Sequence, residues 1–273
     1  MVQAADRVRI MGILNVTPDS FSDGGRFVTQ GSVLAQAAAM VEAGADIIDV
    51  GGESTRPFAE PISIDEELRR VIDAIGAIRK YHPIPISIDT TKALVAREAL
   101  AAGADIINDI SALSFDPEMI DLVRATDVPV IIMHMKGTPR NMQKNPVYED
   151  VVTEIVSFLD ERLQWAAKMG VERERFIVDP GIGFGKTVSH NLQIVKRLRE
   201  FTSLGCPLLL GHSRKSFIGT VLGREVDDRE IGTAAVSVLG ALNGAAILRV
   251  HDVATTVQAV RMTEAVMAAD ATN

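Results

Sequence analysis

The sequence is poor in cysteine, in aromatic residues and in positive charge. It holds one cysteine, Cys206, in 273 residues, so it cannot form an internal disulfide, which favours a reducing compartment. Its 36 acidic residues against 28 basic ones give a formal net charge of −8, which argues against a general nucleic-acid binder or a basic membrane-surface protein. No apolar run approaches the roughly 18 residues of a membrane span, and the N-terminus lacks the apolar region of a signal peptide. We expect a soluble, cytoplasmic protein.

Several familiar site patterns are absent as well. No Ser-His-Asp or Cys-His arrangement is evident, and the His and Cys spacing of a zinc site is missing. The glycine-rich stretch Phe176–Lys186 does not fit the dinucleotide-binding fingerprint, because its glycines occupy every second position. It does not fit a P-loop either, because Pro180 stands where the first glycine should be. This stretch therefore indicates a site of another kind.

Phe176–Lys186 predicts a short buried strand that ends in Asp179 and is stopped by Pro180. A carboxylate at the end of a buried strand is costly unless a partner bonds to it. Asp179 is therefore either a cap for the next turn, through an Asx bond, or a group that binds a ligand. The glycines that follow allow a left-handed backbone and a close approach of the main chain to a ligand.

Apolar runs of strand length alternate with segments of helical period along the chain, and 47% of the residues are hydrophobic. This alternation predicts a parallel sheet covered by helices. The predicted strands are Val8–Leu14, Ile47–Val50, Ile84–Ile88, Asp105–Ile107, Pro129–Met133, Phe176–Val178, Leu208–Leu210 and Ala246–Val250. The predicted helices are Val33–Ala43, Asp65–Tyr81, Lys92–Ala102, Glu118–Ala125, Tyr148–Met169, Asn191–Phe201, Arg229–Asn243 and Val253–Ala268.

An internal repeat indicates how these units close. The sequence Ala-Gly-Ala-Asp-Ile-Ile-Asp at Ala43–Asp49 recurs with one change at Ala102–Asn108. In each copy a glycine ends a helix, and the chain turns directly into a buried strand. Eight such units in a chain of this length fit a (β/α)8 TIM barrel better than an open doubly wound sheet. No Pro-, Ser- or charge-rich linker divides the chain, so we predict one α/β barrel domain over residues 1–273 with long first and second βα loops.

A TIM barrel builds its active site at the C-terminal ends of its strands. Asn15 opens a loop of about a dozen residues after the first strand, where about 2–6 are usual, and its oxygen is suited to Mg²⁺. Asp89 and Asn108 each end a strand and could each be a helix N-cap. Together with Asp179, however, they form a set that can accept hydrogen bonds from a flat heterocycle.

Positive groups follow the last two strands. Lys215 lies in Gly211–Gly219, a stretch that leads into a helix whose N-terminal amides favour an anion. Arg249 and His251 lie two residues apart on the last strand and so point the same way. Because the chain is acidic overall, this positive cluster is local. It indicates an aromatic or heterocyclic substrate that bears phosphate or carboxylate.

Together these motifs resemble the dihydropteroate synthase family of the folate pathway. The similar stretches are Gly12–Gly25, Ile48–Pro57, Asp179–Lys186 and Gly211–Gly219, and the resemblance runs from about residue 9 to about residue 262. It implies a barrel enzyme, usually a homodimer and a target of sulfonamides, which mimic 4-aminobenzoate. It also implies a Mg²⁺-dependent transfer that joins 7,8-dihydropterin-6-ylmethyl diphosphate to 4-aminobenzoate, giving 7,8-dihydropteroate and pyrophosphate.

The resemblance also implies roles for individual residues. The pterin would be held by Asp89, Asn108, Asp179 and Lys215, with Met133 beneath its ring. Asn15 would contact Mg²⁺, and the diphosphate would be taken by Thr55, Arg56, Arg249 and His251. The aminobenzoate carboxylate would bind Ser216, with its ring among Phe21, Pro57, Phe184 and the stem of Lys215.

The chemistry implied is a dissociative displacement without a covalent enzyme intermediate. Diphosphate leaves once positive groups neutralise its charge, and Asp89, Lys215 and Arg249 are the residues expected to act in catalysis. The loops at Asn15–Gly25 and Ser54–Ile62 would close over the site and exclude water. Two alternatives remain: a methyltransferase that binds a pterin and serves a corrinoid, which needs no cluster for diphosphate, and a non-catalytic pterin-binding paralogue.

Overall fold

The computed structural model describes residues 7–17, 30–54 and 59–269, in which strands and helices alternate along the chain. The strands are β1 (Arg9–Asn15), β2 (Ile47–Gly51), β3 (Ile86–Asp89), β4 (Ile106–Asp109), β5 (Val130–Met133), β6 (Phe176–Asp179), β7 (Leu209–Leu210) and β8 (Ile247–Val250). The α-helices are α1 (Gln30–Glu42), α2 (Ile64–Tyr81), α3 (Ala93–Ala101), α4 (Met119–Ala125), α5 (Val151–Lys168), α6 (Val188–Lys196), α7 (Ser216–Leu222), α8 (Glu230–Leu242) and α9 (Val253–Met267). Short 3-10 helices are η2 (Arg173–Arg175), η3 (Leu198–Leu204) and η4 (Val226–Asp228).

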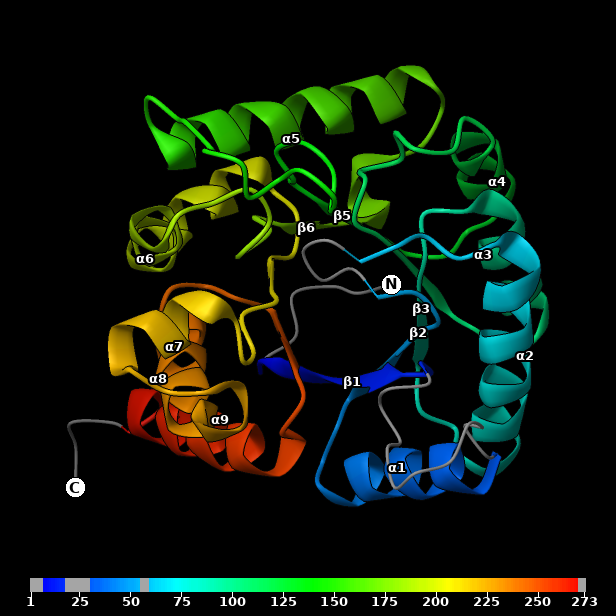
Figure 1. The fold of residues 1–273 in the computed structure, drawn as a ribbon, viewed down its shortest axis with the longest axis horizontal. Coiled ribbons are helices and arrows are strands. Elements are labelled where there is room, and N and C mark those ends of the chain that lie inside the picture. Colours follow the sequence, from blue (N-terminus) through cyan, green and yellow to red (C-terminus); the bar gives the residue numbers. More distant parts are fainter. Residues whose placement is uncertain (1–6, 18–29, 55–58, 270–273) are drawn as a thin grey trace.

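The strands form one parallel sheet in the order β6-β5-β4-β3-β2-β1-β8-β7. The two ends of this order meet at a bridge between Val178 and Leu208, where the Val178 amide donates to the Pro207 carbonyl at 3.0 Å. The sheet therefore closes into a barrel, and the helices surround it (Figure 1). The predicted (β/α)8 TIM barrel is confirmed.

The barrel interior has two layers with different chemistry. Its lower layer is one buried apolar cluster of strand residues: Met11, Ile47, Ile106, Ile131, Ile177, Leu209 and Ile247. Side chains two residues apart on a strand point to the same face, so the next interior positions are Ile13, Asp49, Asn108, Met133, Asp179, Gly211 and Arg249. This second layer lies at the C-terminal ends of the strands, the mouth of the barrel. The lower interior of the barrel is therefore apolar, and a largely polar layer lies above it at the mouth.

The predicted elements differ from the structure mainly at their ends. The apolar runs predicted as strands end one residue before Asp89, Asn108 and Asp179, whereas these residues lie within β3, β4 and β6; Asp179 ends its strand, as predicted from Phe176–Lys186. The predicted helix Asn191–Phe201 was wrong as a single helix. It begins earlier, at Val188, because the Thr187 side chain caps it, and the chain after Lys196 continues as the 3-10 helix η3. No helix among the described residues is long and apolar enough to cross a membrane.

The internal repeat has one structural role in both copies. Gly44 and Gly103 follow α1 and α3 with φ of +93° and +112°, a region that favours glycine. The aspartate two residues later then accepts a hydrogen bond from the first amides of the neighbouring strand. Asp46 accepts from the Ile10 amide at 2.8 Å, and Asp105 accepts from the Ile86 amide at 2.8 Å. The repeat therefore builds the N-terminal end of the barrel, its floor.

Candidate active site

The mouth of the barrel contains a pocket of about 300 Å³, part of it open to solvent. It is lined by Asp89, Asn108, Ile110, Met133, Asp179, Phe184, Gly211, Lys215 and Arg249. Most of these are residues for which the sequence predicted a site, and they come from six different strands or the segments that follow them. The structure therefore brings the predicted pterin-binding set together in one place.

Other predicted residues lie at the edge of this pocket or outside the described part of the chain. Ser216 is exposed at the start of α7, and the Nδ1 atom of His251 lies 2.9 Å from the Ser213 hydroxyl. Neither lines the pocket. Asn15 is half-buried at the end of β1. Phe21, Thr55, Arg56 and Pro57 lie outside the described residues.

Arg249 links two carboxylates across the mouth. Its Nε donates to Asp49 Oδ2 at 2.6 Å, and its Nη2 donates to Asp89 Oδ2 at 2.7 Å. Burial alone would lower the pKa of Arg249, but these two carboxylates outweigh burial and raise it. Because one guanidinium faces two acids, one negative charge is left without a full counter-charge.

Asp89 shows the effect of that surplus charge. Burial raises its pKa to about 7, Arg249 opposes the shift, and Asp49 adds to it. A carboxylate in this state gains from any cation that enters the pocket. Perturbed acids in a cleft are typical of functional sites, so Asp89 is the acid in the mouth best suited to meet a developing positive charge.

Asp179 and Lys215 form the opposite wall of the pocket. The Asp179 carboxylate accepts from the Gly181 amide at 2.7 Å. Burial raises the pKa of Asp179 to about 6, while that hydrogen bond and Lys215 oppose the shift. The Lys215 Nζ lies 4.2 Å from the centroid of the Phe184 ring, a cation–π contact that leaves the ring facing the pocket. This wall offers both an acceptor and an apolar surface.

The glycines of the β6–α6 loop have the conformations that the sequence predicted. Gly181, Gly183 and Gly185 have φ of +70°, +83° and +65°. A Cβ at Gly181 would lie 2.0 Å from the carbonyl oxygen of His134, so no other residue fits there without moving the backbone. The loop after β6 therefore packs directly on the segment after β5, and this contact sets the position of Phe184.

Sequence reasoning missed two buried charged residues at the mouth. Asp49 is fully buried and bonds Arg249 as well as the Asn108 amide, at 3.2 Å. Lys186 is also buried, and its Nζ lies 3.0 Å from His134 Nδ1 and 2.9 Å from the Phe184 carbonyl. Burial lowers the pKa of Lys186 to about 7. The spacing of Asp49 two residues after Ile47 would have placed it in the second interior layer.

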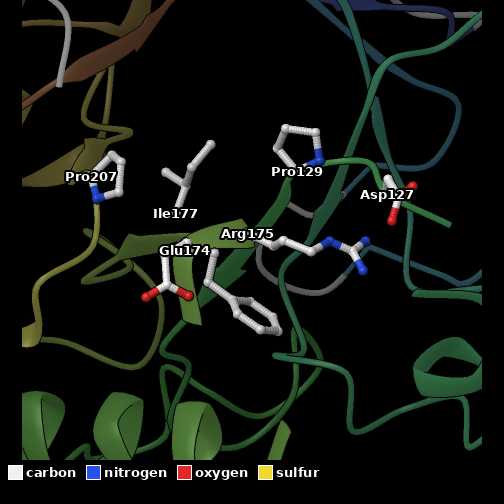
Figure 2. Close-up of a pocket in the computed structure, with 7 residues that line it drawn as sticks. Asp127, Pro129, Glu174, Arg175, Ile177 and Pro207 are labelled. Atoms are coloured by element: carbon white, nitrogen blue, oxygen red, sulfur yellow. The ribbon is translucent and has the colours of Figure 1, made fainter. Parts of the chain in front are cut away.

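A second cavity, of about 390 Å³, lies at the floor near the starts of β5 and β6. Figure 2 shows Arg175 extending toward Asp127, with Pro129 and Pro207 on either side of Ile177. The Arg175 guanidinium is already used, because it donates to the carbonyls of Val123 and Val128 at 2.8 and 2.7 Å. This cavity is therefore a poorer candidate for a ligand site than the pocket at the mouth.

The fold and the mouth together define a barrel enzyme that binds a flat, polar heterocycle and stabilises both positive and negative charge beside it. Residues 11–251 match the family described as pterin binding enzyme. The dihydropteroate synthase of Haemophilus influenzae is 50% identical over 248 residues, which cover 91% of this chain and 90% of that protein. The chain belongs to the dihydropteroate synthase family of pterin-binding enzymes.

Solved structures agree with this placement. A dihydropteroate synthase from Yersinia pestis, solved with a sulfonamide drug complex, matches with a TM-score of 0.92 and 44% identity. The match covers 96% of this chain and 95% of that one. The Xanthomonas albilineans dihydropteroate synthase in complex with 7,8-dihydropteroate matches with a TM-score of 0.89 and 44% identity. This match covers 97% of this chain and 95% of that one. At this identity the comparison supports the family as well as the fold.

Proposed function

We propose that this chain condenses 7,8-dihydropterin-6-ylmethyl diphosphate with 4-aminobenzoate, giving 7,8-dihydropteroate and pyrophosphate in folate biosynthesis. One observation carries the proposal: the mouth joins acids and an amide that suit a pterin to Arg249 and Lys215, which suit anions. The relatives support it, since they are dihydropteroate synthases across nearly their whole length. A corrinoid methyltransferase would have no use for these positive groups.

The pterin binds through acceptors that point into the pocket. Asp89 and Asp179 accept from its amino and ring N–H groups, and the Asn108 amide supplies a further polar contact. Met133 is almost fully buried and packs with Ile110 and Phe184, so it forms an apolar base beneath the ring. This assignment is supported by the lining of the pocket.

The reaction is a dissociative displacement in which this chain supplies positioning and charge. Arg249 and Lys215 oppose the negative charge that develops on the leaving diphosphate. The carbon left behind is cationic, and Asp89, whose ionisation is held back by burial, gains stabilisation as that cation forms. The aminobenzoate amine is neutral, so placing it beside the carbon matters more than removing its proton. No side chain becomes covalently bound.

Mg²⁺ is the proposed metal, and the side chains at the end of β1 fit it. A Cβ built on Gly51 would lie 3.7 Å from Asn15 Oδ1 and 3.8 Å from Asp89 Oδ2, so both oxygens flank the space beside that glycine. Mg²⁺ commonly takes one or two protein oxygens and completes its shell with water and substrate phosphate. Bound there by Asn15, it would supply further charge neutralisation for the diphosphate.

The 4-aminobenzoate site is proposed beside Phe184 and Lys215. The Phe184 ring and the Lys215 stem would contact its ring, and Ser216 would receive its carboxylate at the outer edge of the mouth. The predicted contributions of Phe21 and Pro57 concern residues outside the described part of the chain. Sulfonamides would compete at this site, a proposal supported by the Yersinia pestis complex.

A homodimer in the cytoplasm completes the proposal. Helices α8 and α9 carry large apolar side chains that one chain leaves exposed: Ile231 is 85% exposed, Met262 65% and Val266 62%. Helices α8 and α9 pack against each other, and large exposed apolar side chains on neighbouring helices are typical of protein interfaces. The single, buried cysteine supports a reducing compartment.

The test is the release of pyrophosphate from the dihydropterin diphosphate with Mg²⁺, measured with and without 4-aminobenzoate. We expect release that requires 4-aminobenzoate and that is matched by dihydropteroate. Pterin binding without release would instead favour a non-catalytic pterin-binding protein, and release without 4-aminobenzoate would overturn the proposed second substrate.

A further inference from the structure

Four side chains occupy equivalent interior positions on alternate strands of the barrel. Each lies two residues after an isoleucine of the apolar layer, on β2, β4, β6 and β8: Asp49, Asn108, Asp179 and Arg249. In a TIM barrel the interior side chains of alternate strands form one layer. Three of the four line the pocket. Asp49 is the exception: it is fully buried and does not line the pocket.

Asp49 bonds two members of this layer at once. Its Oδ2 accepts from Arg249 Nε at 2.6 Å and from Asn108 Nδ2 at 3.2 Å, and its Oδ1 lies 3.4 Å from the same Nδ2. These contacts join β2 to β4 and to β8, strands that are not its hydrogen-bonded neighbours β1 and β3. Asp49 is therefore the one link through which Asn108 and Arg249 are held together in the described part of the barrel interior.

The contact with Asn108 also decides which end of that amide faces the pocket. A carboxylate accepts hydrogen bonds and does not donate them, so Asn108 must turn its NH₂ group toward Asp49. Its Oδ1 is then the atom available to a ligand. In the same way, the Nε contact fixes the plane of the Arg249 guanidinium and leaves its Nη2 toward Asp89.

We propose that Asp49 is a positioning residue for the pterin diphosphate: it does not touch the substrate, but orients the Asn108 carbonyl toward the pterin and the Arg249 guanidinium toward the diphosphate. This inference rests on the proposed function. Errors of about 1 Å in a positioned group can cost about 100-fold in rate. Removing the Asp49 charge should therefore harm the use of one substrate far more than the use of the other.

The test compares Asp49→Asn with the matched control Ser87→Ala. Ser87 is the β3 residue paired with Asp49 in the sheet register, is equally buried, and its hydroxyl has no hydrogen-bond partner in the described structure. We expect Asp49→Asn to raise KM for the pterin diphosphate about tenfold or more, with KM for 4-aminobenzoate unchanged. Ser87→Ala should change neither. Loss of kcat alone, as from a smaller folded fraction, would overturn the proposal.

A double-mutant cycle tests the action through Asn108. Asn108→Ala should weaken pterin binding much less in the Asp49→Asn background than in the wild type, whereas independent losses that multiply would contradict the proposal. If Asp49→Asn folds poorly, the exchange of the two residues replaces it. Asn108→Asp sets two carboxylates face to face, and adding Asp49→Asn to it should restore binding; no restoration would overturn the proposal.

Calorimetry with the bare dihydropterin separates this inference from the proposed function. If the wild type binds pterin but shows no turnover, the proposed catalytic function is wrong. The double-mutant cycle of Asp49 and Asn108, measured on pterin binding, still decides the role of Asp49. If the wild type binds no pterin, both are wrong.

Discussion

Both ends of the barrel hold charged side chains, but those at the mouth are buried or half-buried, those at the floor are half-buried or exposed, and the two sets bond to different partners. At the floor, Asp46 and Asp105 accept from the amides of Ile10 and Ile86, and Arg175 donates to the carbonyls of Val123 in α4 and of Val128 after it. At the mouth, Arg249 bonds two side chains and no backbone group in the described contacts. The floor charges include backbone groups among their partners, whereas at the mouth Arg249 joins Asp49 and Asp89 through side chains; Asp179 and Lys186, also at the mouth, bond backbone groups.

This difference explains why only one end is suited to chemistry. A charge that satisfies a backbone group cannot turn to a ligand without leaving that group unpaired, at a cost of about 1–3 kcal/mol. In the cluster of Asp49, Asp89 and Arg249, a ligand can replace one charge partner with another. Burial there raises the pKa of Asp89 to about 7 and that of Asp179 to about 6. Variants at the two ends should therefore fail in different ways.

The largest effect is expected from Asp89→Asn. Loss of the carboxylate removes the negative charge that faces the forming cation, and electrostatic groups of this kind are worth about 100- to 1000-fold in rate. Binding of the bare pterin should fall much less, since the amide keeps the shape and part of the hydrogen bonding. Single-turnover rates and calorimetry measure the two quantities, and equal losses in both would count against the electrostatic role.

The dependence of kcat/KM on pH should report the ionisation of Asp89. Asp89 must be ionised to act, and its pKa is raised to about 7, so kcat/KM for the pterin diphosphate should fall about tenfold for each pH unit below that value. Asp179 and Lys186, with pKa values of about 6 and about 7, titrate nearby. The part of the acid-side fall that is absent in Asp89→Asn is due to Asp89. If the pH profile of this variant had the same shape as that of the wild type, the ionisation of Asp89 would not control the rate.

At the floor, Arg175→Ala should cost stability and leave catalysis alone. It removes the guanidinium donor of the Val128 carbonyl and leaves the Val123 carbonyl with the longer contacts from Thr126, which predicts a loss of about 1–3 kcal/mol in the free energy of unfolding. Urea unfolding measures this loss. Because Arg175 also lines the floor cavity, a large fall in kcat/KM of the folded variant would show that this end of the barrel contributes to the reaction.

The smallest effect is expected from Cys206→Ser. Cys206 is buried, and burial raises the pKa of its thiol to about 11, so it is protonated at neutral pH. The Sγ contacts the Arg173 carbonyl at 3.7 Å, which a serine hydroxyl can replace. We expect unchanged turnover and a stability loss below about 1.5 kcal/mol. Inactivation of the wild type by iodoacetamide at pH 8, absent in the variant, would contradict this.

The sequence was sufficient to predict the barrel and most of the mouth, because both depend on position along a strand. The end of each apolar run fixed where Asp89, Asn108 and Asp179 would lie. Contacts between distant strands could not be predicted in this way. The bond between Asp49 and Arg249 joins residues 200 positions apart, and it depends on which side chains meet across a closed barrel.

The internal repeat shows both what the sequence could predict and what it could not. Its glycines and helix ends were predicted correctly, because a left-handed turn after a helix is local. The same seven residues also place one aspartate at the floor and a polar side chain at the mouth three residues later. Asp49 and Asn108 are the two copies of that last position, and they bond to each other. Only the closed barrel reveals that contact.

The contrast between mouth and floor is tested most directly by one matched pair, Asp89→Asn and Asp105→Asn. The same substitution is made at either end of neighbouring strands, and kcat/KM and the free energy of unfolding are measured for both variants. We predict that Asp89→Asn loses catalysis with little change in stability, and that Asp105→Asn, which replaces the charged acceptor of the Ile86 amide and of Arg79 with a neutral one, loses some stability with little change in catalysis. If both variants lost activity in proportion to stability, the two ends would not differ and the account would be wrong.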